Sequence, residues 1–194
     1  MMKPKFKVLI LLLLIVSAAA ITLLANGCFE ASVPFSAKSR ESVKAYVKAN
    51  KELVNDAGNL ALRYGKLNYV SLRESELTVQ KNDEIKIQRF DSGNEPVHPL
   101  IITHKTLSEV LKNCQKAFAN NETAVFQMGT KRFGSTTWGF YYCDDDEPHG
   151  LKLCGDEYLE ADGDGWSYSE FRDEGVYIYV ERLEPNIFFF YRIY

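Results

Sequence analysis

Residues 187–194 read Ile-Phe-Phe-Phe-Tyr-Arg-Ile-Tyr, and five of these eight side chains are aromatic. Aromatic and β-branched side chains favour β-strands, because they pack well on a pleated surface. A strand with one solvated face should alternate between apolar and polar residues, whereas this run is apolar on both faces. We predict a strand that is either central and covered on both faces, or exposed as an aromatic surface that meets a partner.

The sequence before this strand contains further short strands. Of the 25 aromatic residues, 17 lie in 123–194, and turn sequences rich in Asp, Gly, Pro and Asn separate its apolar runs. The predicted strands are 124–128, 137–142, 151–154, 166–171 and 176–183. Short strands joined by tight turns predict an antiparallel meander.

Two amphipathic helices are predicted ahead of the meander. Residues 38–54 (KSRESVKAYVKANKELV) and 106–120 (TLSEVLKNCQKAFAN) both repeat apolar side chains at helical spacing. Thr106 and Glu109 match a capping box at the start of the second helix. Alternation in 76–79 and 84–87 predicts a hairpin between the two helices. The predicted fold class is therefore α+β, with an N-terminal membrane helix and two amphipathic helices packed on an antiparallel β-meander.

The N-terminal region has the features of a membrane-targeting segment. Residues 8–25 read VLILLLLIVSAAAITLLA and carry no charge. Eighteen helical residues span about 27 Å, close to the thickness of the hydrocarbon core of a bilayer. Lysines precede this run at positions 3, 5 and 7, which places the N-terminus in the cytoplasm and the rest of the chain on the extracytoplasmic side of the cell membrane.

The end of this apolar run leaves three alternatives open: an uncleaved signal anchor, a lipoprotein signal or a cleaved secretory signal peptide. Residues 24–28 read Leu-Ala-Asn-Gly-Cys and resemble a bacterial lipobox, in which Cys28 would be lipidated. Residues 25–27 also fit the small-x-small cleavage site of a secretory signal peptide. The predicted organisation is thus a signal anchor or lipoprotein signal over 1–28, a tether over 29–37, and a single extracytoplasmic domain over 38–194.

The charge of the chain limits its partners. The net charge is −3, and residues 121–194 hold 15 acidic and six basic side chains. An acidic surface repels polyanions, so nucleic-acid binding is excluded for this half of the chain. The predicted partners are the membrane, through residues 8–25, and a protein or peptide.

Residues 160–165 (Glu-Ala-Asp-Gly-Asp-Gly) form the strongest candidate metal site in the sequence. Carboxylates at alternate positions before a glycine are typical of calcium loops, so Glu160, Asp162 and Asp164 are candidate ligands. An EF-hand would need a glutamate at position twelve, where Phe171 stands, and helical flanks instead of strands. Asp-Gly is also the preferred two-residue hairpin turn, so a plain turn is the alternative.

Cys143 and Cys154 are candidates for a disulfide. A hairpin centred between Pro148 and His149 would place the two cysteines opposite each other, at a separation suited to a bridge. Two buried free thiols are the alternative. Asp144-Asp145-Asp146-Glu147, between the cysteines, is interpreted as a solubilising loop.

Catalysis has little support in the sequence. His98, His104 and His149 are scattered, and neither an HExxH nor a GxSxG motif is present. We predict a non-catalytic, membrane-tethered extracytoplasmic domain that binds a protein or peptide partner. The alternative is a calcium-dependent surface module that uses the 160–165 turn. A more remote alternative is an extracytoplasmic hydrolase that uses His149 beside the acidic loop.

Three short motifs behind the N-terminal anchor carry a family resemblance: GFYY at 139–142, DGDGW at 162–166 and FFFY at 188–191. The chain resembles an uncharacterised family of small anchored proteins from Gram-positive anaerobic bacteria. The resemblance implies an extracytoplasmic α+β domain and brings no assigned activity.

Overall fold

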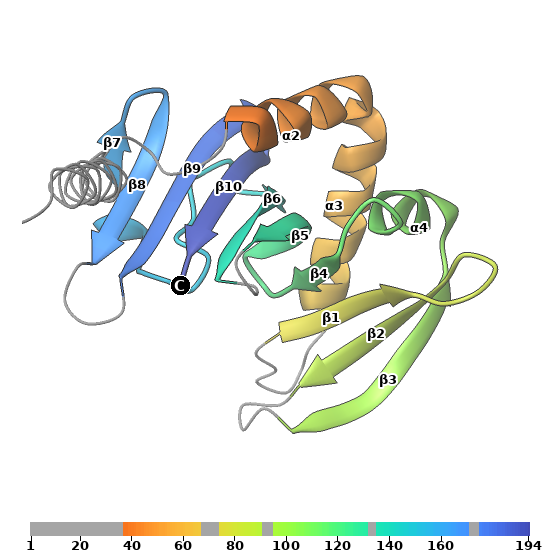
Figure 1. The fold of residues 1–194 in the computed structure, drawn as a ribbon. Coiled ribbons are helices and arrows are strands. Elements are labelled where there is room, and N and C mark those ends of the chain that lie inside the picture. Colours follow the sequence, from red (N-terminus) through yellow and green to blue (C-terminus); the bar gives the residue numbers. More distant parts are fainter. Residues whose placement is uncertain (1–36, 67–73, 91–94, 132–134, 171–174) are drawn as a thin grey trace, which may run out of the picture. The chain divides into compact units, whose positions relative to one another are not determined.

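An antiparallel sheet dominates the structure, a computed structural model (Figure 1). The structure describes residues 37–66, 74–90, 95–131, 135–170 and 175–194. Within these residues the sheet has ten strands in the order β3-β2-β1-β4-β5-β6-β10-β9-β8-β7. The strands are β1 (Glu74–Val79), β2 (Glu84–Phe90), β3 (Pro96–Thr103), β4 (Lys116–Ala119), β5 (Thr123–Lys131), β6 (Thr136–Cys143), β7 (Glu160–Asp162), β8 (Gly165–Glu170), β9 (Val176–Glu184) and β10 (Ile187–Ile193).

Helices α2 (Ala37–Ala49), α3 (Lys51–Lys66) and α4 (Lys105–Leu111) pack on one face of the sheet. Their apolar stripes include Val43, Val47, Val54 and Ala61, which are all buried. The approach between helix and sheet is close, because a Cβ at Gly58 would lie 2.5 Å from the Cβ of Tyr142. Within the described residues, none of the helices is long and apolar enough to cross a lipid bilayer.

The predicted fold class, a membrane helix and two helices on a β-meander, is wrong. The described chain is mostly sheet with three helices, and its strands do not follow one another in a simple meander, because β10 pairs with both β6 and β9. The predicted membrane helix at 8–25 lies outside the described residues.

The predicted helix at 106–120 is also wrong in its second half. Helix α4 ends at Leu111, and residues 116–119 form β4 between β1 and β5. Ala117 and Ala119 are buried while Lys116 is exposed, which is the two-residue period of a strand. The helix begins at Lys105 and is capped by His104, whose Nδ1 accepts a hydrogen bond from the backbone N–H of Leu107 at 3.4 Å, in place of the predicted Thr106 cap.

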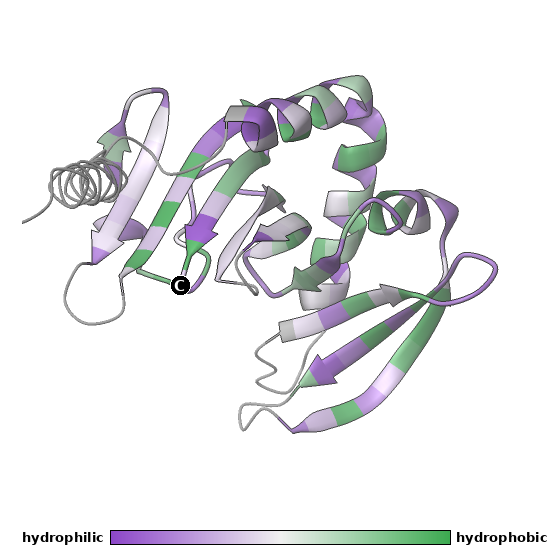
Figure 2. Cartoon of the chain, viewed as in Figure 1, coloured by the Kyte–Doolittle hydropathy of each residue, from purple (hydrophilic) through white to green (hydrophobic). Residues whose placement is uncertain are grey.

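The hairpin predicted around residues 81–83 is confirmed. Strands β1 and β2 pair on either side of Asn82 and Asp83, whose φ angles of 53° and 59° fit a two-residue hairpin turn. Along β2 the colours in Figure 2 alternate between hydrophobic and hydrophilic, as expected for a strand with one covered face. Ile85 and Ile87 are its buried residues.

Strand β10 is central and covered on both faces, as one of the two sequence-based alternatives predicted. It lies between β6 and β9, and all residues from Ile187 to Tyr191 are buried. Phe188 and Phe190 face a cluster that includes Tyr141 and Val180. Phe189 points to the opposite face, where the helices pack. The aromatic run is therefore core and not a partner surface.

The burial of each face of β10 can be tested separately by truncating one phenylalanine on that face. We expect Phe188→Ala and Phe189→Ala each to lower the free energy of unfolding by about 3–5 kcal/mol, because each leaves a cavity in a closed core. Urea denaturation would measure both losses. Tyr158→Ala, at a side chain that is 59% exposed, is the control and should cost less than about 1 kcal/mol. A small loss for either phenylalanine would show that its face is open.

Candidate functional site

Residues 144–159, which we call the flap, follow β6 and cover the face of the sheet opposite the helices. Leu151 is buried against Val125 and Tyr141, and Leu153 and Leu159 pack beside it. The helices contact the other face, where Tyr46 stacks on Phe140. Since neighbouring residues of a strand point to opposite faces, Tyr141 and Cys143 face the flap.

The predicted strand at 151–154, and with it the hairpin that would pair Cys143 with Cys154, is wrong. Residue 143 lies opposite Thr123 of β5, and its backbone N–H donates to the carbonyl of Asn186. Residues 151–154 form turns instead of a strand. The register on which the bridge depended is absent, and Cys114, Cys143 and Cys154 are free thiols.

The acidic loop at the start of the flap is fixed to the turn between β9 and β10. The carboxylate of Asp146 accepts a hydrogen bond from the backbone N–H of Asn186 at 2.7 Å and forms an ion pair with Arg182. Arg182 also donates to the backbone carbonyl of Asp146 at 2.7 Å. Asp146 therefore holds structure together, and the loop is more than the solubilising segment that its sequence suggested.

His149 is buried in the flap between two carboxylates. Its Nε2 lies 3.0 Å from Oδ2 of Asp145, and its Nδ1 lies 2.9 Å from Oδ2 of Asp156. The backbone N–H of His149 donates to the hydroxyl of Tyr141 at 2.9 Å, and the N–H of Gly150 donates to Oδ1 of Asp156 at 2.6 Å. The two carboxylates fix the orientation of the imidazole ring, and the bond to Tyr141 fixes the backbone of the same residue.

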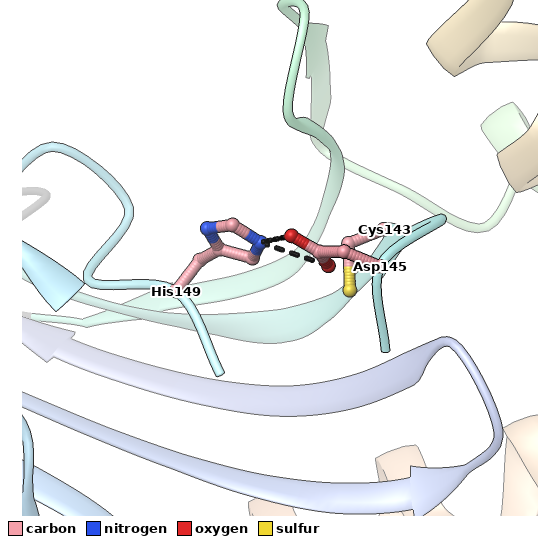
Figure 3. Close-up of side chains that lie close together, drawn as sticks. All are labelled: Cys143, Asp145 and His149. Carbon is pink, nitrogen blue, oxygen red and sulfur yellow. Dashed lines mark hydrogen bonds and ion pairs between the residues drawn. The ribbon is translucent and has the colours of Figure 1, made fainter. Parts of the chain in front are cut away.

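Cys143 completes a cluster with Asp145 and His149, shown in Figure 3. One ligating atom from each residue lies within 4.8 Å of the others. Burial, together with the neighbouring Asp145 carboxylate, raises the pKa of the Cys143 thiol to about 12. Burial would raise the pKa of Asp145, but hydrogen bonds from the backbone of Glu147 and from His149 outweigh it and leave that pKa below its ordinary value.

The three residues predicted as calcium ligands lie on a different hairpin. Glu160 and Asp162 belong to β7, and Asp164 shares a two-residue turn with Gly163, whose φ is +59°. The carboxylate of Asp164 is 86% exposed and lies 3.8 Å from the guanidinium of Arg40. Among the described residues, the metal-ligand groups that converge are Cys143, Asp145 and His149. The structure places the acidic turn in a hairpin and does not bring its three carboxylates together.

The remaining sequence candidates are separate from this cluster. His98 is exposed on β3, and His104 caps α4. Cys28, the predicted lipidation site, lies outside the described residues.

A groove of about 510 Å³ lies beside the flap, on the same face of the sheet. Strands β4, β5, β6 and β10 contribute to its floor, and Leu151, Lys152 and Leu153 of the flap form one wall. Its other lining residues are Gln115, Lys116, Phe118, Asn120, Thr123, Val125, Gln127, Thr130, Thr137, Arg192 and Tyr194. Among the described lining residues there are three cationic side chains, Lys116, Lys152 and Arg192, and no aspartate or glutamate.

The side chain of Arg192 and the backbone at Lys152 are held in place by their surroundings. The guanidinium of Arg192 lies 5.2 Å from the ring centre of Phe190 and 5.3 Å from that of Tyr194, and its Nε donates to the hydroxyl of Thr137 at 3.3 Å. Leu151 and Lys152 have φ angles of 50° and 68°. Two consecutive non-glycine residues with positive φ are uncommon and mark a backbone that its surroundings hold in place.

Sequence reasoning missed this groove. Its one local signal is in β5, where Thr123, Val125 and Gln127 face the groove side and alternate with the helix-facing Ala124 and Phe126. The groove-facing and the helix-facing residues are all buried. The sequence of this strand therefore predicts a core strand and gives no sign of a groove. Comparisons of the chain with protein-family models, curated proteins and solved structures found no match.

The burial of Cys143 predicts slow alkylation. We expect iodoacetamide to modify Cys143 in the native full-length chain at least about tenfold more slowly than Cys154, because Cys143 is fully buried and Cys154 is partly exposed. Mass spectrometry of the cysteine-containing peptides would give both rates. In denaturant the two rates should converge. Rapid native labelling of Cys143 would instead indicate an accessible, reactive nucleophile.

Proposed function

We propose that this protein is a non-catalytic binding domain that holds an acidic peptide segment of a partner protein in the groove beside the flap. We further propose that the domain is attached to the membrane through residues 8–25 and faces the extracytoplasmic side. The observation that carries the proposal is a groove whose described lining holds the cationic side chains of Lys116, Lys152 and Arg192 and no aspartate or glutamate, in a chain whose net charge is −3.

The charges favour an anionic occupant. Residues 121–194 carry 15 acidic and six basic side chains, yet two of the three groove cations, Lys152 and Arg192, come from this acidic half. A groove lined by one sign of charge concentrates ligands of the opposite sign. Arg192 is held between two aromatic rings, so less side-chain entropy is lost when a carboxylate binds it.

The other lining groups favour a peptide over a simple anion. Gln115 and Gln127 line the groove with amide groups of the kind that donate and accept hydrogen bonds, as a peptide backbone requires. The Oδ1 of Asn120 already accepts from the backbone N–H groups of Glu122 and Thr123, so this residue contributes its amide donor. Phe118, Leu151 and Leu153 provide apolar contacts for side chains. The volume of about 510 Å³ lies within the range of about 300–1,000 Å³ that is typical of ligand sites.

The position of the reactive side chains supports binding over catalysis. The described lining of the groove includes no histidine, cysteine, aspartate or glutamate side chain that could act as nucleophile or general base. Cys143 is buried beneath the flap, and His149 is buried within it. The hydrolase alternative would need His149 to reach a substrate, and this residue has its ring nitrogens directed at Asp145 and Asp156.

Peptide binding can be tested with two matched probes. We expect the full-length chain to bind a short labelled peptide that alternates Glu and Leu, and to bind the corresponding Lys–Leu peptide much more weakly. Fluorescence polarisation would measure both affinities. Lys116→Glu and Lys152→Glu should each weaken binding of the acidic peptide about tenfold, because each replaces an attraction by a repulsion.

Lys81→Glu is the control for this experiment, because Lys81 is exposed in the β1–β2 turn and does not line the groove. This variant should bind the acidic peptide within about twofold of the unmodified chain. Equal binding of the two peptides, or acidic-peptide binding that is unaffected by Lys116→Glu and Lys152→Glu, would contradict the proposal.

The proposed location has its own test. We expect a protease added outside intact cells to degrade residues 37–194, because residues 8–25 would hold the chain in the membrane with its domain outside. Immunoblotting of the domain, beside a cytoplasmic marker that stays intact, would show this. Full-length chain recovered in the cytosol and protected from the protease would contradict the assignment.

A further inference from the structure

We infer that Cys143, Asp145 and His149 form a binding site for a transition-metal ion of the zinc class. Sγ of Cys143, a carboxylate oxygen of Asp145 and a ring nitrogen of His149 lie within 4.8 Å of one another. In a tetrahedral zinc site, ligand atoms about 2.0–2.3 Å from the ion are about 3.3–3.8 Å apart. Small side-chain adjustments therefore bring the three atoms to zinc-binding geometry.

The ligand atoms of this cluster favour a transition metal over calcium or magnesium. One sulfur, one imidazole nitrogen and one carboxylate oxygen are a typical set for zinc and related transition metals. Calcium and magnesium take oxygen ligands, and this cluster offers too few of them. The site therefore differs in position and in chemistry from the calcium loop that the sequence suggested at residues 160–165.

Asp156 binds the second ring nitrogen of His149, as carboxylates commonly do for histidines that bind a metal. Such a histidine usually donates its other ring N–H to a carboxylate, which fixes the ring and directs the free nitrogen at the metal. Nδ1 of His149 lies 2.9 Å from Oδ2 of Asp156, and the backbone N–H of Gly150 holds the other oxygen of that carboxylate. Nε2 is then left facing Asp145.

The structure also provides a route for the ion. The side chains of Cys143 and His149 are buried, whereas that of Asp145 is 50% exposed. Figure 3 shows the Asp145 carboxylate beside both of the other groups, so rotation of this one side chain opens the centre of the cluster. On binding, the thiol of Cys143 releases its proton to solvent, and water occupies the fourth position of the ion.

A metal at this position would join the end of β6 to the flap. Cys143 is the last residue of β6, and His149 lies two residues before Leu151, which lines the groove. The bound ion would hold the groove wall in place. The metal site does not depend on the peptide-binding proposal, because its ligands lie outside the groove.

Cobalt is the probe for this site, since cobalt–thiolate bonds give a charge-transfer absorption band. We expect the metal-free full chain to bind one Co²⁺ with this band, and Zn²⁺ to displace it. Cys143→Ser should abolish the band, while Cys28→Ser, Cys114→Ser and Cys154→Ser should retain it. Asp156→Asn should keep the band but weaken cobalt binding about 10–100-fold.

Because Cys143 is buried, the Cys143→Ser variant can fail to fold. The variant Asp145→Asn therefore provides a second, independent test of the metal site. Its side chain is half-exposed, and we expect it to fold and to bind cobalt at least about tenfold more weakly than the unmodified chain. Thermal unfolding without metal would verify that it is folded. The inference is overturned if no charge-transfer band forms, if the band survives Cys143→Ser, or if folded Asp145→Asn binds cobalt with unchanged affinity.

Discussion

The apolar character of β10 on both faces is the constraint on which the rest of the fold depends. A single strand that presents Phe188 and Phe190 on one face and Phe189 on the other leaves no side for water. Each buried phenylalanine contributes about 1.5–3 kcal/mol only if its own face is covered. The chain therefore needs two covers, and it uses different materials for them: helices α2 and α3 on one face, and the irregular flap on the other.

The two covers are attached by different interactions. Glu181 of β9 is buried and accepts from Arg40 at 2.6 Å, and it also pairs with Lys44 at 2.7 Å, so α2 is fixed to the sheet by two cations on one carboxylate. The conformation of a helix is also stabilised by its own backbone hydrogen bonds. The flap has few such bonds, and side chains replace them: Asp146 binds the β9–β10 turn, and Asp156 binds His149 and Gly150.

Local patterns predicted some of these elements and failed where distant parts of the chain meet. The β1–β2 turn was predictable because Asn82 and Asp83 tolerate positive φ. The burial of β10 was one of two alternatives that its sequence allowed. Residues 106–120 were predicted as one helix because apolar residues at 107, 110, 111, 114 and 118 fit a helical period. That pattern cannot show that Ala117 and Ala119 fill the space between β1 and β5. The insertion of β10 between β6 and β9 likewise has no local signature.

The cluster of Cys143, Asp145 and His149 was likewise not predictable from local sequence patterns. Cys143, Asp145 and His149 are visible in the sequence, but the hairpin expected there would have placed Cys143 opposite Cys154. The flap cannot form that hairpin, because Tyr141 and Cys143 already lie on a core strand that pairs with β5 and β10. Because β5 and β10 occupy both edges of β6, the residues that follow β6 must leave the sheet and cross its face. The same crossing buries His149 over Tyr141, brings its ring to Asp145 and ends in Leu151 and Lys152 at the groove. The cluster and the groove wall are thus two consequences of one covering segment.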